Sequence, residues 1–364
     1  MQKLFKIISF IILGLICASL LFIYFCPLSS RYSMPAGKYC VGNQLLYFKD
    51  HENKYQLNKI NEFNVDVFYP SNATIQQKFT YRPDYYNAIK NIYAQKTHIP
   101  YFIVNLLMPD LQPYAQPNAP IIQNSTKFPV IITLPGIGGS GINVMLPTEL
   151  ASQGYIVCAI EPPADILVTI FPDGKQIHLD QTLQNAIKKS DRKTIYEYRD
   201  QAHARWINYI NMTIDQLQKL NNDPASIWYQ RLDLDHVGLL GHSHGGAVAL
   251  DYCQKYSRCK AGINLDGWTK TYNVPDSFKT PFLLLMGQHG GIIDIPQVKD
   301  LIENNKRPDF QAITIQGAYH GSFGDGILTP WPWNYIFGES LKNPEKIRLE
   351  INNDIVHFFD RYLK

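Results

Sequence analysis

Apolar positions follow a regular order through the second part of the chain. From Pro129 onward, short and almost continuously apolar runs alternate with polar loops and with stretches of helical periodicity. Runs that are apolar at nearly every position are typical of parallel strands covered on both faces. The predicted strands are Val130–Leu134, Tyr155–Ile160, His236–Leu240, Ala261–Leu265, Phe282–Met286 and Ala312–Ile315. The pattern therefore predicts a mostly parallel, doubly wound α/β sheet with flanking helices.

Helical periodicity is strongest in Thr194–Leu220 and in the last segment, Asn352–Leu363. Before Pro129, alternating strand-like runs lie around Leu45–Phe48 and Asn64–Tyr69. An aromatic and proline-rich stretch, Phe79–Pro120, separates these runs from the α/β pattern. We expect residues 31–364 to form one domain, in which 31–128 supply N-terminal strands and a cap-like apolar segment and 129–364 supply the core.

Residues 1–30 have a different character. Lys3 and Lys6 precede twenty mostly apolar residues, Ile7–Cys26, which as a helix would span about 30 Å, the thickness of a bilayer core. An uncleaved transmembrane anchor fits this length better than a cleaved signal peptide, for which the Cys17–Ser19 segment is a poor cleavage site. Both alternatives stay open. Because lysines favour an inside N-terminus, both place the rest of the chain outside the cytoplasm, membrane-anchored or secreted.

Charge and cysteine content narrow the function classes. The net charge is +3, without a long basic run, which argues against a nucleic-acid partner. Cys253 and Cys259 flank a predicted helix end and could form a disulfide in an oxidising compartment, or could both stay free. Cys158 lies within a predicted strand, where packing explains it. No cysteine or histidine group has metal-site spacing, so no metal is expected.

The segment Gly241–Gly245, Gly-His-Ser-His-Gly, carries the strongest chemical signal. It follows the apolar run His236–Leu240 and leads into a helix-like run, Gly246–Lys255. This is the strand–turn–helix setting of a nucleophile elbow, in which a G-x-S-x-G motif exposes a serine on a sharp turn. Glycines are needed on either side because strand and helix backbones crowd there. Ser243 is the predicted nucleophile.

A serine nucleophile needs a base and an acid that orients the base. Asp266 follows the strand after the elbow, and His320 lies in a loop after the last predicted strand, so all three residues fall at the carboxyl ends of strands. The order Ser, Asp, His is that of α/β-hydrolases. Many hydrolases place the acid one strand later, where this chain has Gly290, with Asp294 four residues on. We favour Asp266 over Asp294.

An oxyanion hole requires two backbone N–H groups aimed at the developing negative charge. His244, the residue after the nucleophile, is predicted to supply one of them. The glycine-rich loop Leu134–Gly139 follows an early strand and should supply the other, from Ile137 or, as second choice, Gly138. This loop lacks the lysine and Ser/Thr ending of a phosphate-binding P-loop.

With these residues in place, the chain resembles the platelet-activating-factor acetylhydrolases of the plasma, lipase-like type. Gly241–Gly246 matches that family's elbow, Cys259–Trp268 resembles its acid loop, and Ile313–Phe323 resembles its histidine segment. Further matches at Val41–Gly42 and Phe68–Ser71 extend the resemblance over nearly all the chain after residue 30. His244 departs from the family, since an aromatic residue usually follows the serine.

The resemblance implies an α/β-hydrolase fold and a serine-dependent carboxylic ester hydrolase. It implies a calcium-independent, phospholipase A2-like activity, without a cofactor, on the sn-2 ester of phospholipids with short or oxidised acyl chains. His244 and the Pro- and Trp-rich region after His320 depart from the family, so a broader lipid or small-molecule esterase is an alternative. A separate alternative is an acyltransferase that uses the same triad. A non-catalytic binding module is disfavoured because all three triad positions are filled.

The resemblance also implies that two apolar segments contact a membrane surface. In this sequence they fall on Ile99–Met108 and around Trp331–Phe337, and ordinary packing of a cap over the core is the alternative. The candidate interface residues are Tyr101, Phe102, Leu106, Leu107, Trp331, Trp333 and Phe337.

Overall fold

The computed structural model describes residues 10, 13–14, 17–18, 33–55, 57, 60–73, 78–108, 110–123, 126–141, 143–267, 277–289, 292, 295–304, 307–325 and 343–364. The strands are β1 (Cys40–Lys49), β2 (Glu62–Ser71), β3 (Gln116–Pro117), β4 (Phe128–Leu134), β5 (Ile156–Glu161), β6 (Val168–Ile170), β7 (Gln176–His178), β8 (Leu232–His242), β9 (Cys259–Leu265), β10 (Phe282–His289) and β11 (Phe310–Tyr319). The helices are α2 (Pro83–Thr97), α3 (Tyr101–Leu107), α4 (Met145–Ser152), α5 (Gln181–Lys189), α6 (Arg192–Asn222), α7 (His244–Lys255), α8 (Pro296–Asn304), α10 (Pro344–Leu363) and the 3₁₀ turn η2 (His320–Phe323).

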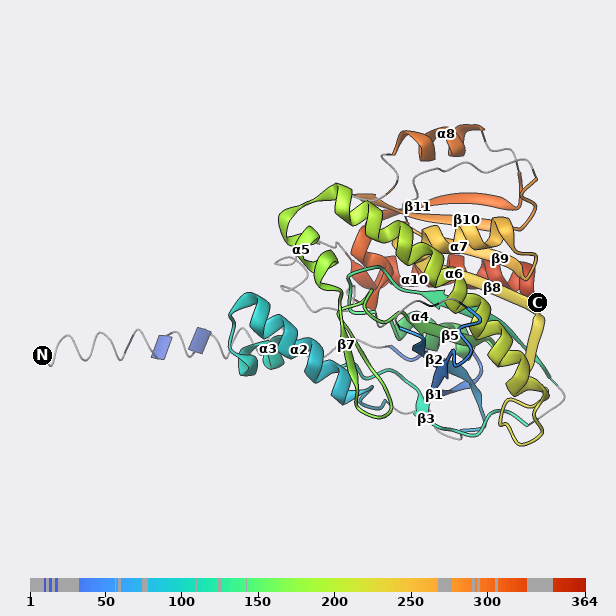
Figure 1. The fold of residues 1–364 in the computed structure, drawn as a ribbon, viewed down its shortest axis with the longest axis horizontal. Helices are drawn as coiled ribbons and strands as arrows, with labels where there is room; N and C mark the ends of the chain where they lie inside the picture. Colours follow the sequence, from blue (N-terminus) through green and yellow to red (C-terminus); the bar gives the residue numbers. More distant parts are fainter. Residues whose placement is uncertain are drawn as a thin grey trace, which may run out of the picture.

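A single large sheet organises the fold (Figure 1). Its strand order is β11-β10-β9-β8-β4-β5-β2-β1-β3, and the neighbours from β11 to β5 all pair in parallel. Strand β2 pairs antiparallel with both β5 and β1, which extends the sheet at that edge. The predicted mostly parallel, doubly wound sheet is confirmed.

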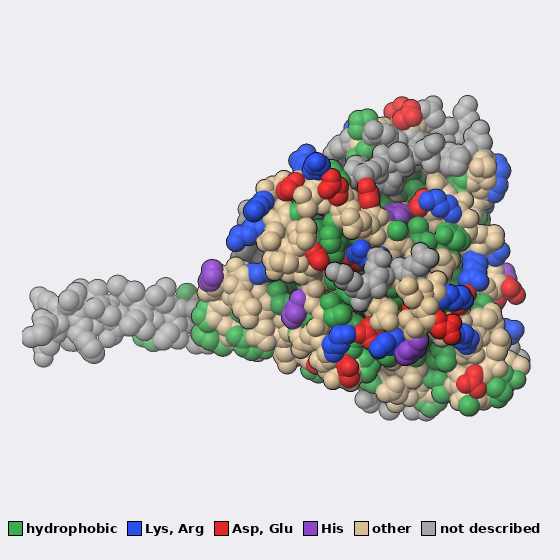
Figure 2. All heavy atoms as spheres, in the orientation of Figure 1, with side chains coloured by type: hydrophobic (Ala, Val, Ile, Leu, Met, Phe, Trp, Pro, Cys, Tyr) green, Lys and Arg blue, Asp and Glu red, His purple; other side chains and the backbone are tan. Residues whose placement is uncertain are grey.

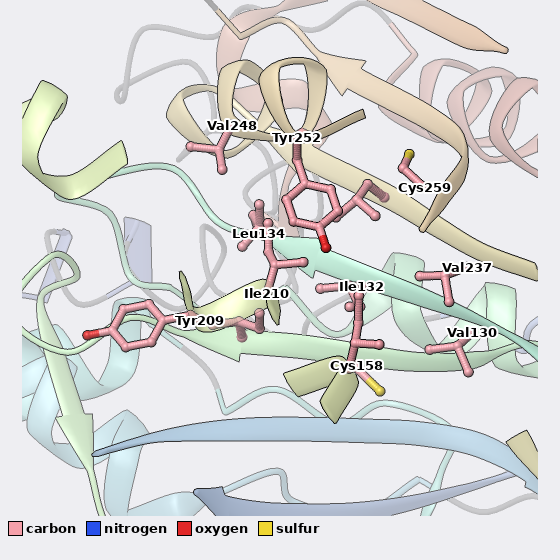
Figure 3. Packing of buried hydrophobic residues seen from close by; sticks show 14 of the residues in the cluster. Val130, Ile132, Leu134, Cys158, Tyr209, Ile210, Val237, Val248, Tyr252 and Cys259 are labelled. Carbon is pink, nitrogen blue, oxygen red and sulfur yellow. The ribbon is translucent and has the colours of Figure 1, made fainter. Parts of the chain in front are cut away.

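Successive side chains of β4 pack alternately into two hydrophobic cores on opposite faces of the sheet. Val130 and Ile132 pack in a cluster with residues of α6 and α7, as Figure 3 shows, whereas Ile131 packs with residues of α4 and α10. All three side chains are fully buried, which explains why the strand reads as a continuous apolar run. Helices therefore cover both faces, with the carboxyl ends of the parallel strands at one edge of the sheet.

Several predicted elements are longer in the structure than in the sequence pattern. Strand β8 extends from the predicted His236 back to Leu232 and on to His242, and β11 runs to Tyr319. Helix α10 begins at Pro344, eight residues before the predicted start, with proline in its first turn. Backbone pairing and helix capping set these ends, and an apolar pattern registers only the positions that are buried.

None of the helices among the described residues is both long and apolar enough to cross a membrane. Most of the predicted span, Ile7–Cys26, lies outside the described residues. The aromatic and proline-rich stretch Phe79–Pro120, whose elements the apolar pattern does not predict, contains α2, α3 and β3.

Cysteine pairing links the end of α7 to the start of β9. Cys253 and Cys259 form a disulfide, with a Cα–Cα distance of 5.0 Å. Cys158 is completely buried in β5, and this burial raises the pKa of its thiol. Its position agrees with the packing role expected from the sequence.

Candidate active site

Ser243 lies on a sharp turn between β8 and α7. Its backbone has φ 55° and ψ −121°, a strained conformation for a residue with a side chain. A Cβ on Gly241 would lie 2.1 Å from the carbonyl carbon of Gly245, and a Cβ on Gly245 would lie 2.5 Å from the carbonyl oxygen of Leu134. Both flanking positions therefore require glycine, as expected for a nucleophile elbow.

Asp266 and His320 meet across the carboxyl ends of β9 and β11. His320 Nδ1 lies 2.7 Å from Asp266 Oδ2. Asp266 is completely buried, and its Oδ1 accepts hydrogen bonds from the backbone N–H groups of Ile292 (3.1 Å) and Gly287 (3.3 Å). The end of β10 and the loop after it, in which many hydrolases carry the acid, thus donate to Asp266 here. Asp294 lies outside the described residues.

The turn that carries Asp266 is held by Asn264. Asp266 has φ 52°, in the left-handed region. The Asn264 side chain closes the turn by accepting from Gly267 N–H at 2.6 Å and donating to Gly267 C=O at 2.9 Å. A backbone bond from Asp266 N–H to the carbonyl of Leu285 (2.8 Å) ties the same turn to β10. The carboxylate is therefore fixed from several sides.

His242 connects the elbow to the histidine segment. Its Nε2 lies 2.9 Å from the carbonyl oxygen of His320, and the two imidazole rings lie 4.7 Å apart. Ser243 N–H donates to the carbonyl of Leu265 at 3.0 Å, which brings the elbow against the strand before Asp266. Among the described residues, Ser243 Oγ makes no hydrogen bond, so the structure joins Asp266 to His320 but not His320 to Ser243. Such catalytic hydrogen bonds often tighten only when substrate binds.

The glycine-rich loop lies directly against the nucleophile. A Cβ on Gly136 would lie 3.4 Å from Ser243 Cβ. Gly138 N–H is already used, because it donates to the carbonyl of Asp165 at 2.7 Å. The N–H groups of Ile137 and His244 donate to no other residue in the part of the chain that the structure describes. Of the two loop candidates for an oxyanion hole, the geometry favours Ile137 over Gly138.

The His244 side chain is buried against α6. Its Nδ1 lies 3.4 Å from Arg199 Nε, and its ring packs edge-to-face on Trp206 at 4.9 Å. Burial, with Arg199 as the largest of the nearby charges, lowers the pKa of His244 well below its usual range. The imidazole is therefore neutral at physiological pH and packs as an aromatic ring against α6.

Asp325 holds the histidine segment against α4. Its carboxylate accepts from the N–H groups of Val144 (2.8 Å) and Met145 (3.1 Å), at the start of that helix. Asn143 donates to the carbonyl of Phe323 at 3.3 Å, which adds a second link. No local sequence signal identifies Asp325, because its partners lie about 180 residues away in the chain.

The candidate membrane-contact residues are described only in part. Tyr101 and Phe102 lie in the first turn of α3 and are 38% and 72% exposed, and Ile99 just before them is also exposed. Hydrophobic side chains gather at the α2–α3 end of the molecule in Figure 2. Leu106 and Leu107 lie in α3, but their side chains are outside the described part, as are Trp331, Trp333 and Phe337 entirely.

His242 is expected to make stability depend on pH. Burial, assisted by the neighbouring His320, lowers the pKa of His242 to about 4. Its pKa in the unfolded chain is near 6.5, so the unfolded state binds more protons between pH 6.5 and 4 and the free energy of unfolding falls as the pH falls. The shift corresponds to about 2 kcal/mol once partial solvent contact is allowed for.

The variant His242→Gln, whose amide can still donate to the His320 carbonyl, should lose this contribution. Urea unfolding at pH 7 and pH 4.5 should therefore show a smaller drop in the free energy of unfolding for the variant than for the wild type. An equal drop in the free energy of unfolding for the two proteins would show that folding does not lower the pKa of His242.

The elbow, the buried acid–histidine pair and the parallel sheet together define a protein of the α/β-hydrolase fold. A ferulic acid esterase from Streptomyces cinnamoneus has a similar structure, with a TM-score of 0.63 and 20% sequence identity, covering 92% of this chain and 94% of that one. Residues 28–356 match the family described as platelet-activating factor acetylhydrolase, isoform II. The chain belongs to this family.

Two curated relatives are distant in sequence. The platelet-activating factor acetylhydrolase of Cavia porcellus is 23% identical over 284 residues, which cover 72% of this chain and 63% of that protein. The protein of the same name from Canis lupus familiaris is 24% identical over 240 residues, which cover 58% of this chain and 51% of the relative. The matched regions therefore span about half to two thirds of the relatives' lengths.

Proposed function

We propose that the protein is a serine-dependent carboxylic ester hydrolase that cleaves the sn-2 ester of phospholipids with short or oxidised acyl chains. The observation that carries the proposal is the 2.7 Å contact between His320 Nδ1 and the buried Asp266, at the edge where Ser243 stands on its strained turn. Family membership supports the lipid substrate, because relatives bear the name platelet-activating factor acetylhydrolase.

The proposed mechanism uses two half-reactions. Ser243 Oγ attacks the ester carbonyl while His320 Nε2 takes its proton, and Asp266 stabilises the imidazolium and fixes the tautomer. The N–H groups of Ile137 and His244 stabilise the tetrahedral oxyanion. His320 then protonates the leaving alcohol, and the same imidazole activates the water that releases the acid from Ser243. This route uses no metal or organic cofactor.

A panel of esters tests the substrate class. Phospholipids with sn-2 chains from acetyl to palmitoyl, and neutral esters of matched chain lengths, are hydrolysed with and without a calcium chelator. We expect the highest kcat/KM for short sn-2 chains and no effect of the chelator. A preference for long chains, or loss of activity with the chelator, would contradict the proposed phospholipid substrate. Ser243 would then act on an ester of another class. Product analysis with a competing alcohol separates hydrolysis from acyl transfer.

We also propose that the exposed apolar end of α3 binds a membrane surface and that the protein works outside the cytoplasm, anchored or secreted. Phe102 is 72% exposed, and burying such a ring stabilises binding by about 1.5–3 kcal/mol. Phe102→Asp should therefore lower activity on phospholipid vesicles about tenfold or more and leave activity on a water-soluble ester unchanged.

Leu349→Asp is the matched control, because Leu349 is also exposed (46%) but lies on α10. Equal losses in the two variants on vesicles, or no loss for Phe102→Asp, would argue that α3 packs as an ordinary cap and does not contact lipid.

A further inference from the structure

A buried carboxylate lies behind the glycine-rich loop. Asp165, in the turn between β5 and β6, is completely buried and takes no part in the Ser243, Asp266 and His320 set. An ionised side chain in the interior is costly unless it is fully hydrogen-bonded. The hydrogen-bond partners of Asp165 therefore indicate which part of the structure this buried carboxylate holds in place.

One helix supplies the donors that hold the Asp165 side chain. Oδ1 accepts from Tyr198 Oη at 2.8 Å and from Arg205 Nη2 at 2.6 Å, and Oδ2 accepts from Trp206 Nε1 at 2.7 Å. All three donors lie on α6. Charge-assisted bonds of this kind are short and directional, so the position of Asp165 is set by α6.

The backbone of the same turn holds the glycine-rich loop. The carbonyl of Asp165 accepts from Gly138 N–H at 2.7 Å, and Leu167 N–H donates to the carbonyl of Gly139 at 2.9 Å. Gly138 has φ 76°, a conformation that suits glycine. On one side of Ile137, these two hydrogen bonds hold the backbone of Gly138 and Gly139 to the Asp165 turn. On its other side, Gly136 lies against Ser243.

Helix α6 also contacts the second oxyanion donor. The Trp206 indole that donates to Asp165 packs edge-to-face on the His244 ring, and Arg199 lies within hydrogen-bonding distance of that ring. His244 is the first residue of α7, so the contacts of its side chain with α6 also anchor the start of the helix that carries its backbone N–H. One face of α6 thus contacts both the turn that holds the glycine-rich loop, which carries the Ile137 N–H, and the start of α7, which carries the His244 N–H.

We propose that Asp165 is a positioning residue. Held by its hydrogen bonds to Tyr198, Arg205 and Trp206, it keeps the Ile137 N–H aimed at the same oxyanion as the His244 N–H. This inference rests on the proposed serine hydrolase function. Oxyanion donors act only when they are aimed at the place where charge develops, and loss of one donor lowers kcat by about 10²–10³. Loosening the Asp165 turn should therefore impair the transition state and leave substrate binding intact.

Two variants of different severity test the inference. Asp165→Asn replaces an acceptor with an amide, and Tyr198→Phe removes one hydroxyl donor without changing the ring. We expect kcat on a short-chain oxygen ester to fall about 100-fold for the first variant and about tenfold for the second, with KM unchanged. In the matching thionoester, sulfur is a poor hydrogen-bond acceptor and gains little from an oxyanion hole. Its rate should hardly change, so the oxygen-to-sulfur rate ratio should fall in both variants.

Matched controls separate positioning from general destabilisation. Glu161→Gln alters another buried carboxylate, which pairs with Arg82, and Tyr155→Phe removes another tyrosine donor, to Asp360. Both should keep the wild-type rate ratio. An unchanged ratio in Tyr198→Phe and in folded Asp165→Asn, or an equal fall in the controls, would overturn the inference. If Asp165→Asn does not fold, Tyr198→Phe decides it. Failure of the proposed function itself would be seen separately, as retained activity in Ser243→Ala.

Discussion

Replacing Ser243 with alanine is expected to lower kcat on a short-chain p-nitrophenyl ester by about a million-fold. In the proposed mechanism the Ser243 hydroxyl forms the acyl intermediate and the triad acts as a unit, so loss of the nucleophile should remove the contribution of His320 and Asp266 as well. The rate left should be the small acceleration that the N–H groups and substrate binding give alone. Steady-state kinetics on purified protein measures the loss.

A serine outside the site gives the control. Ser226 accepts a hydrogen bond from Trp228 N–H in the segment before β8, and Ser226→Ala should keep wild-type kinetics. The far-UV circular dichroism of both variants should match the wild type. Retention of more than a few per cent of activity by Ser243→Ala would remove Ser243 from the mechanism.

Replacing Asp266 with asparagine is expected to lower kcat by about 10⁴-fold. The amide keeps the size of the carboxylate, but it cannot stabilise the imidazolium and it favours the wrong tautomer of His320. Asp266 Oδ1 would still be able to accept from Ile292 N–H, so the loop should keep its place. The measurement is kcat at a pH where the wild type is fully active.

Asp294→Asn is the comparison that separates the two candidate acids. Since Asp266 already holds His320 Nδ1, the Asp294 variant should be close to wild type. A large loss in Asp294→Asn together with a small loss in Asp266→Asn would reverse the assignment of the acid.

Much of the fold could be predicted from the sequence because strands buried on both faces of the sheet consist of continuous apolar runs. Val130, Ile131 and Ile132 pack into two opposite cores, and this makes β4 a continuous apolar run. The elbow was equally visible, since the crowding around Gly241 and Gly245 admits only glycine. The placement of Ser243, Asp266 and His320 after parallel strands then followed from topology.

The supporting residues could not be predicted in the same way. Asp165 meets Arg205 and Trp206 from some 40 residues away, and Asp325 meets Val144 across about 180 residues. Each is a single polar residue in a loop, and nothing local distinguishes it from a solvated one. The apolar pattern also does not predict the ends of β8 and β11, because backbone pairing continues where that pattern stops.

Covalent labelling with a fluorophosphonate probe, with the adduct mapped by tandem mass spectrometry, tests the central claim most directly. Such a probe phosphonylates an activated serine and leaves ordinary hydroxyls unmodified. We predict one adduct per chain, on Ser243, with loss of esterase activity in proportion to labelling and no adduct in Ser243→Ala. An active protein that resists the probe, or one that is labelled at another residue while Ser243 stays unmodified, would contradict the assignment of this protein as a Ser243 hydrolase.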